Sequence, residues 1–159
     1  MHNPEASPYQ PEIKAVKLQK TAEQYFGDRL WELDVVIDEK TIGRAEISHG
    51  GGERVSIESL YIDPAERGKG YGKQAYQAIV DMILSEFPDT ERITSVITNA
   101  AAFRVSLNAQ VPEGWIRMFR LSVFNRGEYV HFKTTDDEAV AYECIGSGGA
   151  VNVVMAKTN

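Results

Sequence analysis

The sequence predicts a single α+β domain in which a mixed sheet is flanked by helices. The chain has 159 residues, which is enough for one domain with one sizeable core. Short runs rich in β-branched and aromatic residues recur along the chain and are typical of strands. Between them lies one long amphipathic segment, which is typical of a helix packed on a sheet.

The first part of the chain predicts a meander of strands. Residues 38–40 form a polar break between two strand-like runs and indicate a hairpin turn. Three glycines at 50–52 precede the next run, and Pro64 ends that run. We therefore expect strands over 13–18, 30–37, 41–48 and 54–62.

The amphipathic segment follows. Apolar residues recur there at steps of three and four, and polar residues fill the gaps, so the pattern predicts a helix that Pro88 ends. The apolar face comprises Tyr71, Ala75, Ala78, Ile79, Met82, Ile83 and Phe87. A short strand is expected over 93–98, after which Asn99 can cap a second helix over 100–108.

Beyond Pro112 the pattern returns to strands, with breaks at 125–127, 134–138 and 146–149. The single cysteine, Cys144, lies in one of these apolar runs. We expect a buried, unreactive thiol there rather than a nucleophile. The expected strands cover 115–124, 129–133, 139–145 and 151–156.

Composition restricts the compartment and the partners. One cysteine excludes an internal disulfide and fits a reducing compartment. The first 12 residues hold three prolines and no apolar run, so we expect a disordered tail over 1–12 before a domain over 13–159. No run is long enough to span a membrane, and the cytoplasm is the expected location. The net charge of −6 disfavours nucleic acid and suits cationic partners such as amines.

The most informative segment is Arg67-Gly68-Lys69-Gly70-Tyr71-Gly72, which joins a strand to the start of the amphipathic helix. Its alternating glycines let the backbone approach a ligand closely. Unpaired amides at a helix start, with the helix dipole behind them, attract negative oxygens. The segment therefore predicts a loop that binds pyrophosphate.

Two other phosphate-binding loops do not fit. A P-loop needs glycine at the position of Arg67 and serine or threonine at the position of Gln74. A dinucleotide fingerprint that began at Gly68 would need glycine or alanine where Lys73 stands. The remaining alternative is a glycine-rich turn that binds no ligand.

Here the sequence resembles the GNAT N-acetyltransferases, whose central motif is Gln or Arg, two residues, Gly, one residue, and Gly or Ala. Arg67, Gly70 and Gly72 match this motif, and the flanking strand and helix match its setting. The resemblance covers about residues 30–107, with a weaker similarity over 152–157. It implies a GNAT-like fold, here with an extra C-terminal β-hairpin, and acetyl-CoA as the co-substrate.

The resemblance also implies which residues hold acetyl-CoA. Amides of the glycine loop would bind the pyrophosphate, and one strand would pair its backbone with the pantetheine arm. Asn99 resembles the family's asparagine that contacts this arm, and it can cap the next helix as well. The expected cofactor-binding residues are Leu60, Tyr61, Ile62, Arg67, Gly68, Lys69, Gly70, Tyr71, Gly72, Lys73 and Asn99.

In this family a neutral amine attacks the thioester directly, without a covalent enzyme intermediate. Glu58 is the candidate base, because it lies four residues before Ile62 on one strand and is expected on the same face. The alternative is a solvated or ion-paired carboxylate. A backbone amide near Ile62 is expected to bind the oxyanion.

The group that protonates the departing thiolate is where the sequence departs from the family. Many members carry a tyrosine seven residues after the strand-ending asparagine, and here that position is Ser106. A serine hydroxyl is shorter and far less acidic than a phenol, so it is a poor substitute. Three alternatives stay open: no protein acid, another group such as Tyr129 or Tyr142, or lost catalysis.

Two segments bear on the acceptor and on partners. Only residues 21–28 separate the first two expected strands with no helix pattern, so the family's helical lid is short or missing. Residues 115–133 form a hairpin that mixes aromatic and basic side chains. It could bind RNA, an acidic protein or a second copy of the chain as a homodimer. The plainer interpretation is ordinary amphipathic strands with solvated basic side chains.

The sequence thus predicts an N-acetyltransferase that moves an acetyl group from acetyl-CoA to a primary amine, on a small molecule, a protein or an aminoacylated RNA. The alternative is a catalytically degraded GNAT-like domain that serves as an acyl-CoA-binding or protein- or RNA-interaction module. Ser106 favours this alternative, whereas the intact glycine loop favours a bound ligand. No metal site is predicted.

Overall fold

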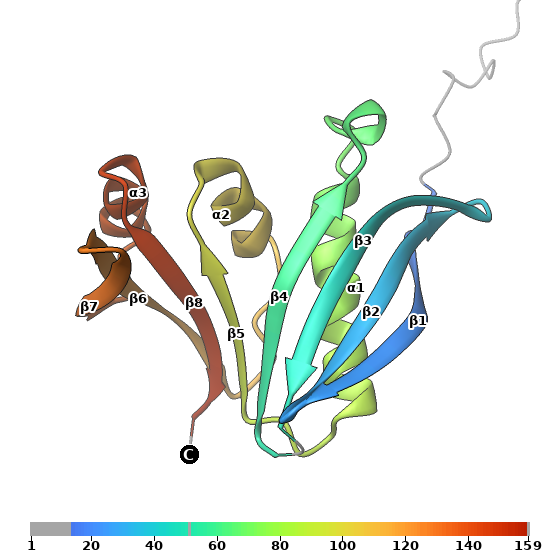
Figure 1. Ribbon diagram of the computed structural model, residues 1–159, viewed down its shortest axis with the longest axis horizontal. Helices are drawn as coiled ribbons and strands as arrows, with labels where there is room; N and C mark the ends of the chain where they lie inside the picture. Colours follow the sequence, from blue (N-terminus) through green and yellow to red (C-terminus); the bar gives the residue numbers. More distant parts are fainter. Residues whose placement is uncertain (1–13, 51, 159) are drawn as a thin grey trace, which may run out of the picture.

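The computed structural model describes residues 14–50 and 52–158, and these form one eight-stranded mixed sheet with three α-helices (Figure 1). The strand order is β1-β2-β3-β4-β5-β8-β6-β7. The tail predicted over 1–12 lies outside the described residues. The elements are β1 (Lys17–Phe26), β2 (Asp28–Ile37), β3 (Lys40–His49), β4 (Arg54–Ile62), a 3₁₀ turn (Pro64–Glu66), α1 (Tyr71–Glu86), β5 (Arg92–Ile97), α2 (Ala100–Leu107), β6 (Trp115–Asn125), β7 (Glu128–Thr135), α3 (Glu138–Gly146) and β8 (Ala150–Lys157).

The N-terminal half is the predicted antiparallel meander. Asp38 and Glu39 both have positive φ and close a two-residue hairpin between β2 and β3. The strand predicted over 13–18 was wrong in extent, because β1 pairs with β2 along its whole length and reaches Phe26. Gly27 alone separates these two strands. Within residues 14–50 no helix lies between these two strands, at the place where the sequence indicated a short or missing helical lid.

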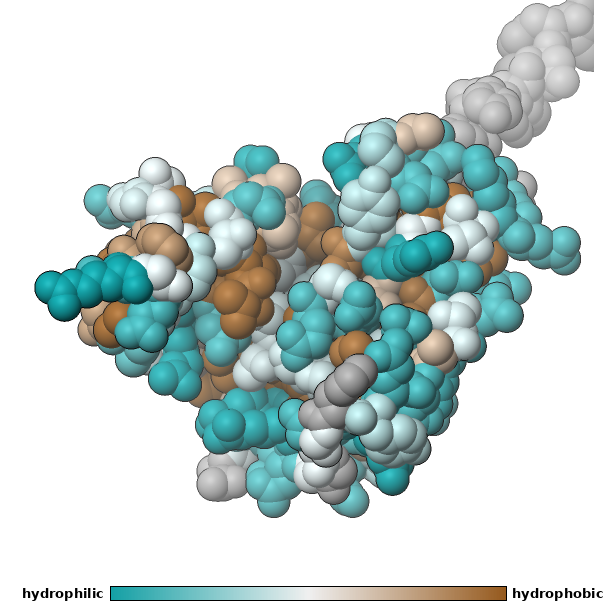
Figure 2. Space-filling model, viewed as in Figure 1, coloured by the Kyte–Doolittle hydropathy of each residue, from teal (hydrophilic) through white to brown (hydrophobic). Residues whose placement is uncertain are grey.

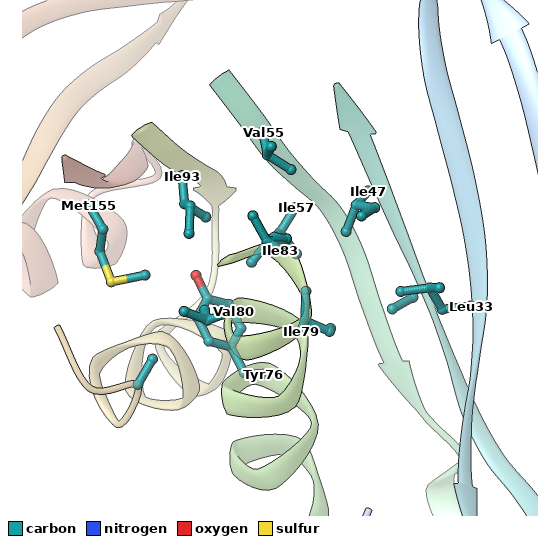
Figure 3. Packing of buried hydrophobic residues seen from close by; sticks show 12 residues of the cluster. Leu33, Ile47, Val55, Ile57, Tyr76, Ile79, Val80, Ile83, Ile93 and Met155 are labelled. Carbon is teal, nitrogen blue, oxygen red and sulfur yellow. The ribbon is translucent and has the colours of Figure 1, made fainter. Parts of the chain in front are cut away.

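Helix α1 confirms the predicted amphipathic helix but buries a wider face than the pattern indicated. Tyr76 and Val80 are buried with Ala75, Ile79 and Ile83, whereas the predicted Ala78 and Met82 are only half-buried. The helix packs across the centre of the sheet, since its core cluster includes residues of β2, β3, β4, β5 and β8. Figure 3 shows the side chains of α1 pointing between these strands.

Strands β4 and β5 separate along their length. They pair in parallel only over residues 54–57 and 92–95, at the start of both strands. Figure 1 shows them close together at these ends and diverging towards the loop before α1. Beyond the paired part, β4 keeps its pairing with β3 on its other side. The sheet is thus opened at its centre.

The strand predicted over 139–145 was wrong, because these residues belong to helix α3. The Asp137 carboxylate caps the helix, accepting from the amides of Ala139 and Val140. The buried residues Ala141, Cys144 and Ile145 stand at helical spacing. A short apolar run without polar alternation fits a strand or a helix equally well, and here the cap decides for the helix.

The C-terminal hairpin is formed by β6 and β7, and β8 lies between β5 and β6. Phe119 of β6 connects the hairpin to a second core cluster, where its ring lies 5.2 Å from the ring of Phe103 in α2. Cys144 belongs to this cluster, and burial raises the pKa of its thiol. The prediction of a buried thiol is confirmed, although the element that carries it is a helix.

Candidate functional site

A cavity of about 690 Å³ opens where β4 and β5 separate. It extends from the last paired residues of the two strands to the glycine loop and the first turn of α1. Figure 2 shows the outer surface of this region, with hydrophobic atoms (brown) inside a notch between the two halves of the sheet. The lining residues are 57–62, 66–68, 70–73, Tyr76, 95–99, Ala101, Ala102 and Val105.

The glycine loop meets the cavity at the start of α1. Gly68 and Gly70 have φ values of 80° and 82°, which side chains other than glycine rarely adopt. Gly70 is the N-cap of α1, and no side chain caps the helix. The amides of the first turn are therefore left for a ligand, and the helix dipole favours a negative one.

Two of the loop cations are engaged within the protein. The Arg67 Nε atom donates to the Ile62 carbonyl at 2.8 Å, and its guanidinium lies over the Tyr61 ring. Arg67 thereby ties the loop to the end of β4. The Lys69 ammonium pairs with Glu66 at 3.0 Å. The hydrogen bonds from Lys69 and Lys40 lower the pKa of the Glu66 carboxyl. Lys73 is the remaining loop cation that lines the cavity.

The cavity side of β4 offers backbone groups to a ligand. Past residue 57, this edge has no partner in β5, while the opposite edge pairs with β3. An extended ligand can therefore hydrogen-bond here as an added strand would. Asn99 lines the same cavity and caps α2 by accepting from the Ala102 amide at 2.8 Å. The predicted cap is confirmed, and the contact of Asn99 with a ligand stays a prediction.

Glu58 lines the cavity, but not on the face that the sequence predicted. The pairing of β3 with β4 shifts between Glu46 and Ile47, and this bulge leaves Glu58 as an extra residue of β4. Ile62 packs with Ala75 of α1. Glu58 instead accepts a hydrogen bond from Ser48 at 2.6 Å and is exposed. The prediction of a shared face was wrong, because a bulge breaks the two-residue period of a strand.

The three hydroxyl groups considered as acids lie outside the cavity lining. Ser106 is 1% exposed, and its Oγ atom donates to the Phe103 carbonyl at 2.7 Å. The Tyr129 ring packs on Phe124 in the exposed end of the hairpin. The Tyr142 ring packs edge-on against Phe103 in the second core cluster.

Among the hydroxyl groups of the cavity lining, the structure brings together two that sequence reasoning missed. Tyr76 and Ser95 both line it, and their oxygen atoms lie 2.7 Å apart. A signal was present for Ser95, because it stands between Ile93 and Ile97 at an inward position of β5. A hydroxyl at such a position needs a buried polar partner.

The described residues show no group of His, Cys, Asp and Glu side chains arranged to hold a metal ion. None of the helices in this part of the chain combines the length and the hydrophobicity that crossing a membrane requires.

Comparison with known proteins agrees with this geometry. The sequence model described as the Acetyltransferase (GNAT) family matches residues 2–105. Comparison with curated protein sequences gives no match.

Similar solved structures show the same fold. Aminoglycoside acetyltransferase AAC(6')-Ib in complex with coenzyme A has a TM-score of 0.52 and 20% identity, over 80% of this chain and 66% of that chain. The chain thus spans just under two thirds of that protein. A Bacillus subtilis acetyltransferase in complex with CoA has a TM-score of 0.53 and 10% identity, over 92% of this chain and 100% of that chain.

Proposed function

Since the chain belongs to the GNAT acetyltransferase family, we propose that it is an enzyme that transfers an acetyl group from acetyl-CoA to a primary amine. One observation carries the proposal: the cavity between the separated strands ends on the uncapped first turn of α1. A long ligand with a pyrophosphate at one end and an extended arm at the other fits this arrangement. CoA is bound in both of the similar structures described above.

In the proposed complex the pyrophosphate lies on the amides of residues 70–73, with Lys73 beside it. The pantetheine arm follows β4 past Ile62, Tyr61 and Leu60, where the backbone edge has no strand partner in β5. From Ile62 to Ile57 this path is about 16 Å long at 3.3 Å per residue. The thioester would therefore lie near the end of the cavity where β4 and β5 begin to pair.

The reaction is a direct attack. The neutral amine nitrogen bonds to the thioester carbon, the C–S bond breaks, and the sulfur leaves with the electron pair. Glu58 lies at the same end of the cavity and is proposed to take the amine proton, directly or through water. Its hydrogen bond with Ser48 holds the carboxylate in place. A backbone amide of β4 beside Glu58, rather than the one expected near Ile62, is proposed to stabilise the oxyanion, because the thioester lies at this end of the cavity.

The acceptor is proposed to approach from the sheet face opposite to α1. Glu32 and Glu46 are paired neighbours on β2 and β3, flanked by inward-facing core residues, and Glu58 lies one strand further on. Three carboxylates on adjacent strands suit an amine that arrives as a cation. One similar structure, AAC(6')-Ib, contains the aminoglycoside kanamycin with coenzyme A.

A second candidate function is acyl-CoA binding without turnover. It is favoured by Ser106, because this serine stands where many members of the family carry a tyrosine. The Ser106 hydroxyl donates to the Phe103 carbonyl within α2. The two functions differ in one measurable property, since only an enzyme consumes the thioester in response to an amine.

The test is the release of free CoA thiol from acetyl-CoA, followed with a thiol reagent, against polyamines, aminoglycosides, amino acids and peptides. The control is the same mixture without amine. We expect thiol release that depends on the amine concentration for at least one class. Tight binding of acetyl-CoA with no amine-dependent release from any class would support the binding function instead.

A further inference from the structure

The closed end of the cavity carries a hydroxyl pair that has no assigned role. Tyr76 projects from α1 towards β5, and Figure 3 shows its hydroxyl oxygen (red) on the side of Ile93 and Met155. Ser95 is the last residue of β5 that pairs with β4, opposite Ile57. Tyr76 is 5% exposed and Ser95 is 4% exposed, yet both line the cavity.

We propose that the Tyr76 hydroxyl donates a hydrogen bond to the sulfur of CoA and that Ser95 positions it. The inference rests on the proposed acetyl-CoA site, because that site brings the sulfur to this end of the cavity. It assigns to Tyr76 the stabilisation of the departing thiolate, which Ser106 cannot supply from its bond to Phe103.

The hydrogen-bond inventory supports this arrangement. Two hydroxyl groups carry two hydrogens, and the bond of 2.7 Å between Tyr76 and Ser95 uses one of them. When Ser95 donates to the phenol oxygen, the phenol hydrogen is left for an acceptor in the cavity. A phenol is the better donor to an anion, because it is the more acidic of the two hydroxyl groups.

The surroundings keep the phenol protonated and place a positive charge near it. Burial raises the pKa of Tyr76, while the bond with Ser95 and the nearby Arg117 act in the opposite direction. The Arg117 guanidinium is half-buried, and one of its Nη atoms donates to the Ala109 carbonyl. Its buried Nε atom has no partner among the described residues. Arg117 therefore adds a fixed positive charge to this end of the site.

The chemical step balances without any further reactant. As the C–S bond breaks, sulfur takes the electron pair and accepts the hydrogen bond from Tyr76. The phenol keeps its proton, and the proton lost by the amine goes to Glu58 or water. Sulfur takes up a proton from solvent when CoA leaves. Tyr76 thus lowers the energy of the thiolate without a covalent role.

The pKa of the thiol of bound CoA tests this inference directly. A hydrogen-bond donor and a positive charge stabilise the thiolate and lower this pKa. The Glu58 carboxylate on the facing strand raises the pKa of the thiol. Lys73 lies at the far end of the cavity, beside the proposed pyrophosphate site. The thiolate is followed by its ultraviolet absorbance during a pH titration of the CoA complex. The complex with desulfo-CoA serves as the blank, because tyrosinate absorbs in the same region.

We expect Tyr76→Phe to raise the pKa of the bound thiol by about one unit, a tenfold change in the ratio of thiolate to thiol. Ser95→Ala should shift it in the same direction by a smaller amount. Tyr142→Phe is the matched control, since it removes a phenol hydroxyl outside the cavity lining, and it should leave the thiol pKa unchanged. If Tyr76→Phe does not fold, the thiol pKa of Ser95→Ala is compared with that of the wild type, and an unchanged pKa would overturn the inference.

A purely structural role for the pair would lower the melting temperature of Tyr76→Phe and leave the thiol pKa unchanged. That result, with CoA still bound, would overturn the inference while amine-dependent turnover would keep the proposed function intact. In turnover we expect kcat to fall about tenfold, with KM for acetyl-CoA changed less than about twofold. A shifted thiol pKa in a protein without amine-dependent turnover would support the hydroxyl pair and contradict the proposed function. Failure of the wild type to bind CoA would overturn both.

Discussion

Substitution of Gly70 tests the anion site at the start of α1 more sharply than any other single change. The position is left-handed, with φ of 82°, and a Cβ atom built there meets no atom within 4 Å. A side chain therefore costs about 1–2 kcal/mol of backbone strain but causes no clash. Asp and Asn tolerate this conformation best and have the same size, so Gly70→Asn is the control for Gly70→Asp.

The two variants differ only in charge. A carboxylate about 5 Å from a phosphate charge, at an effective dielectric constant between about 20 and 80, repels it by about 1–3 kcal/mol. This corresponds to a loss of about 5- to 150-fold in acetyl-CoA affinity. At a concentration of about 100 times the Kd, acetyl-CoA stabilises the folded state by about 2.7 kcal/mol. A 100-fold weaker Kd reduces that gain to about 0.4 kcal/mol.

The assay is thermal unfolding with and without acetyl-CoA. For a domain of this size, about 2.7 kcal/mol raises the Tm by about 5–10 °C, and we expect most of this rise to remain in Gly70→Asn. In Gly70→Asp the rise should fall to about 1 °C. Equal shifts in the two variants would refute the placement of the pyrophosphate at this turn.

Three further predictions follow from the same geometry. Glu58→Gln should fold normally and lower the rate on the best amine by about one to three decades, and the loss should shrink at high pH, where more amine is neutral; a small loss independent of pH would leave Glu58 as a bystander. Ser106→Ala should change turnover less than about threefold, which is about 0.7 kcal/mol in the barrier, because the Ser106 hydroxyl donates to the Phe103 carbonyl. A large loss of turnover, with folding and acetyl-CoA affinity intact, would contradict this prediction. Gly43→Ala should cost at least about 2 kcal/mol in urea unfolding, because its Cβ would lie 2.2 Å from the Tyr61 carbonyl oxygen; an unchanged midpoint would show that β3 can move away from β4.

The sequence was informative where local chemistry decides the structure. The period of the apolar residues predicted α1, and the glycines before Tyr71 predicted a loop that the structure places against a cavity. Asn99 was identified as a cap because an N-cap depends only on residues within one turn. The mixed α+β fold followed from the order of these local signals.

The sequence was less informative where distant residues decide. The bulge at Glu58 exists only in the pairing of β4 with β3, and no local pattern indicated it. Tyr76 and Ser95 are 19 residues apart, and only the packing of α1 on β5 brings their hydroxyl groups together. Helix α3 was mistaken for a strand because a nine-residue apolar helix has few turns in which to show its period.

The structure of the protein bound to acetyl-CoA tests the central claim most directly. We expect the pyrophosphate on the amides of residues 70–73, the pantetheine arm hydrogen-bonded along β4, and the sulfur within hydrogen-bonding distance of the Tyr76 hydroxyl. Acetyl-CoA bound elsewhere, with no ligand in the cavity between β4 and β5, would contradict the account.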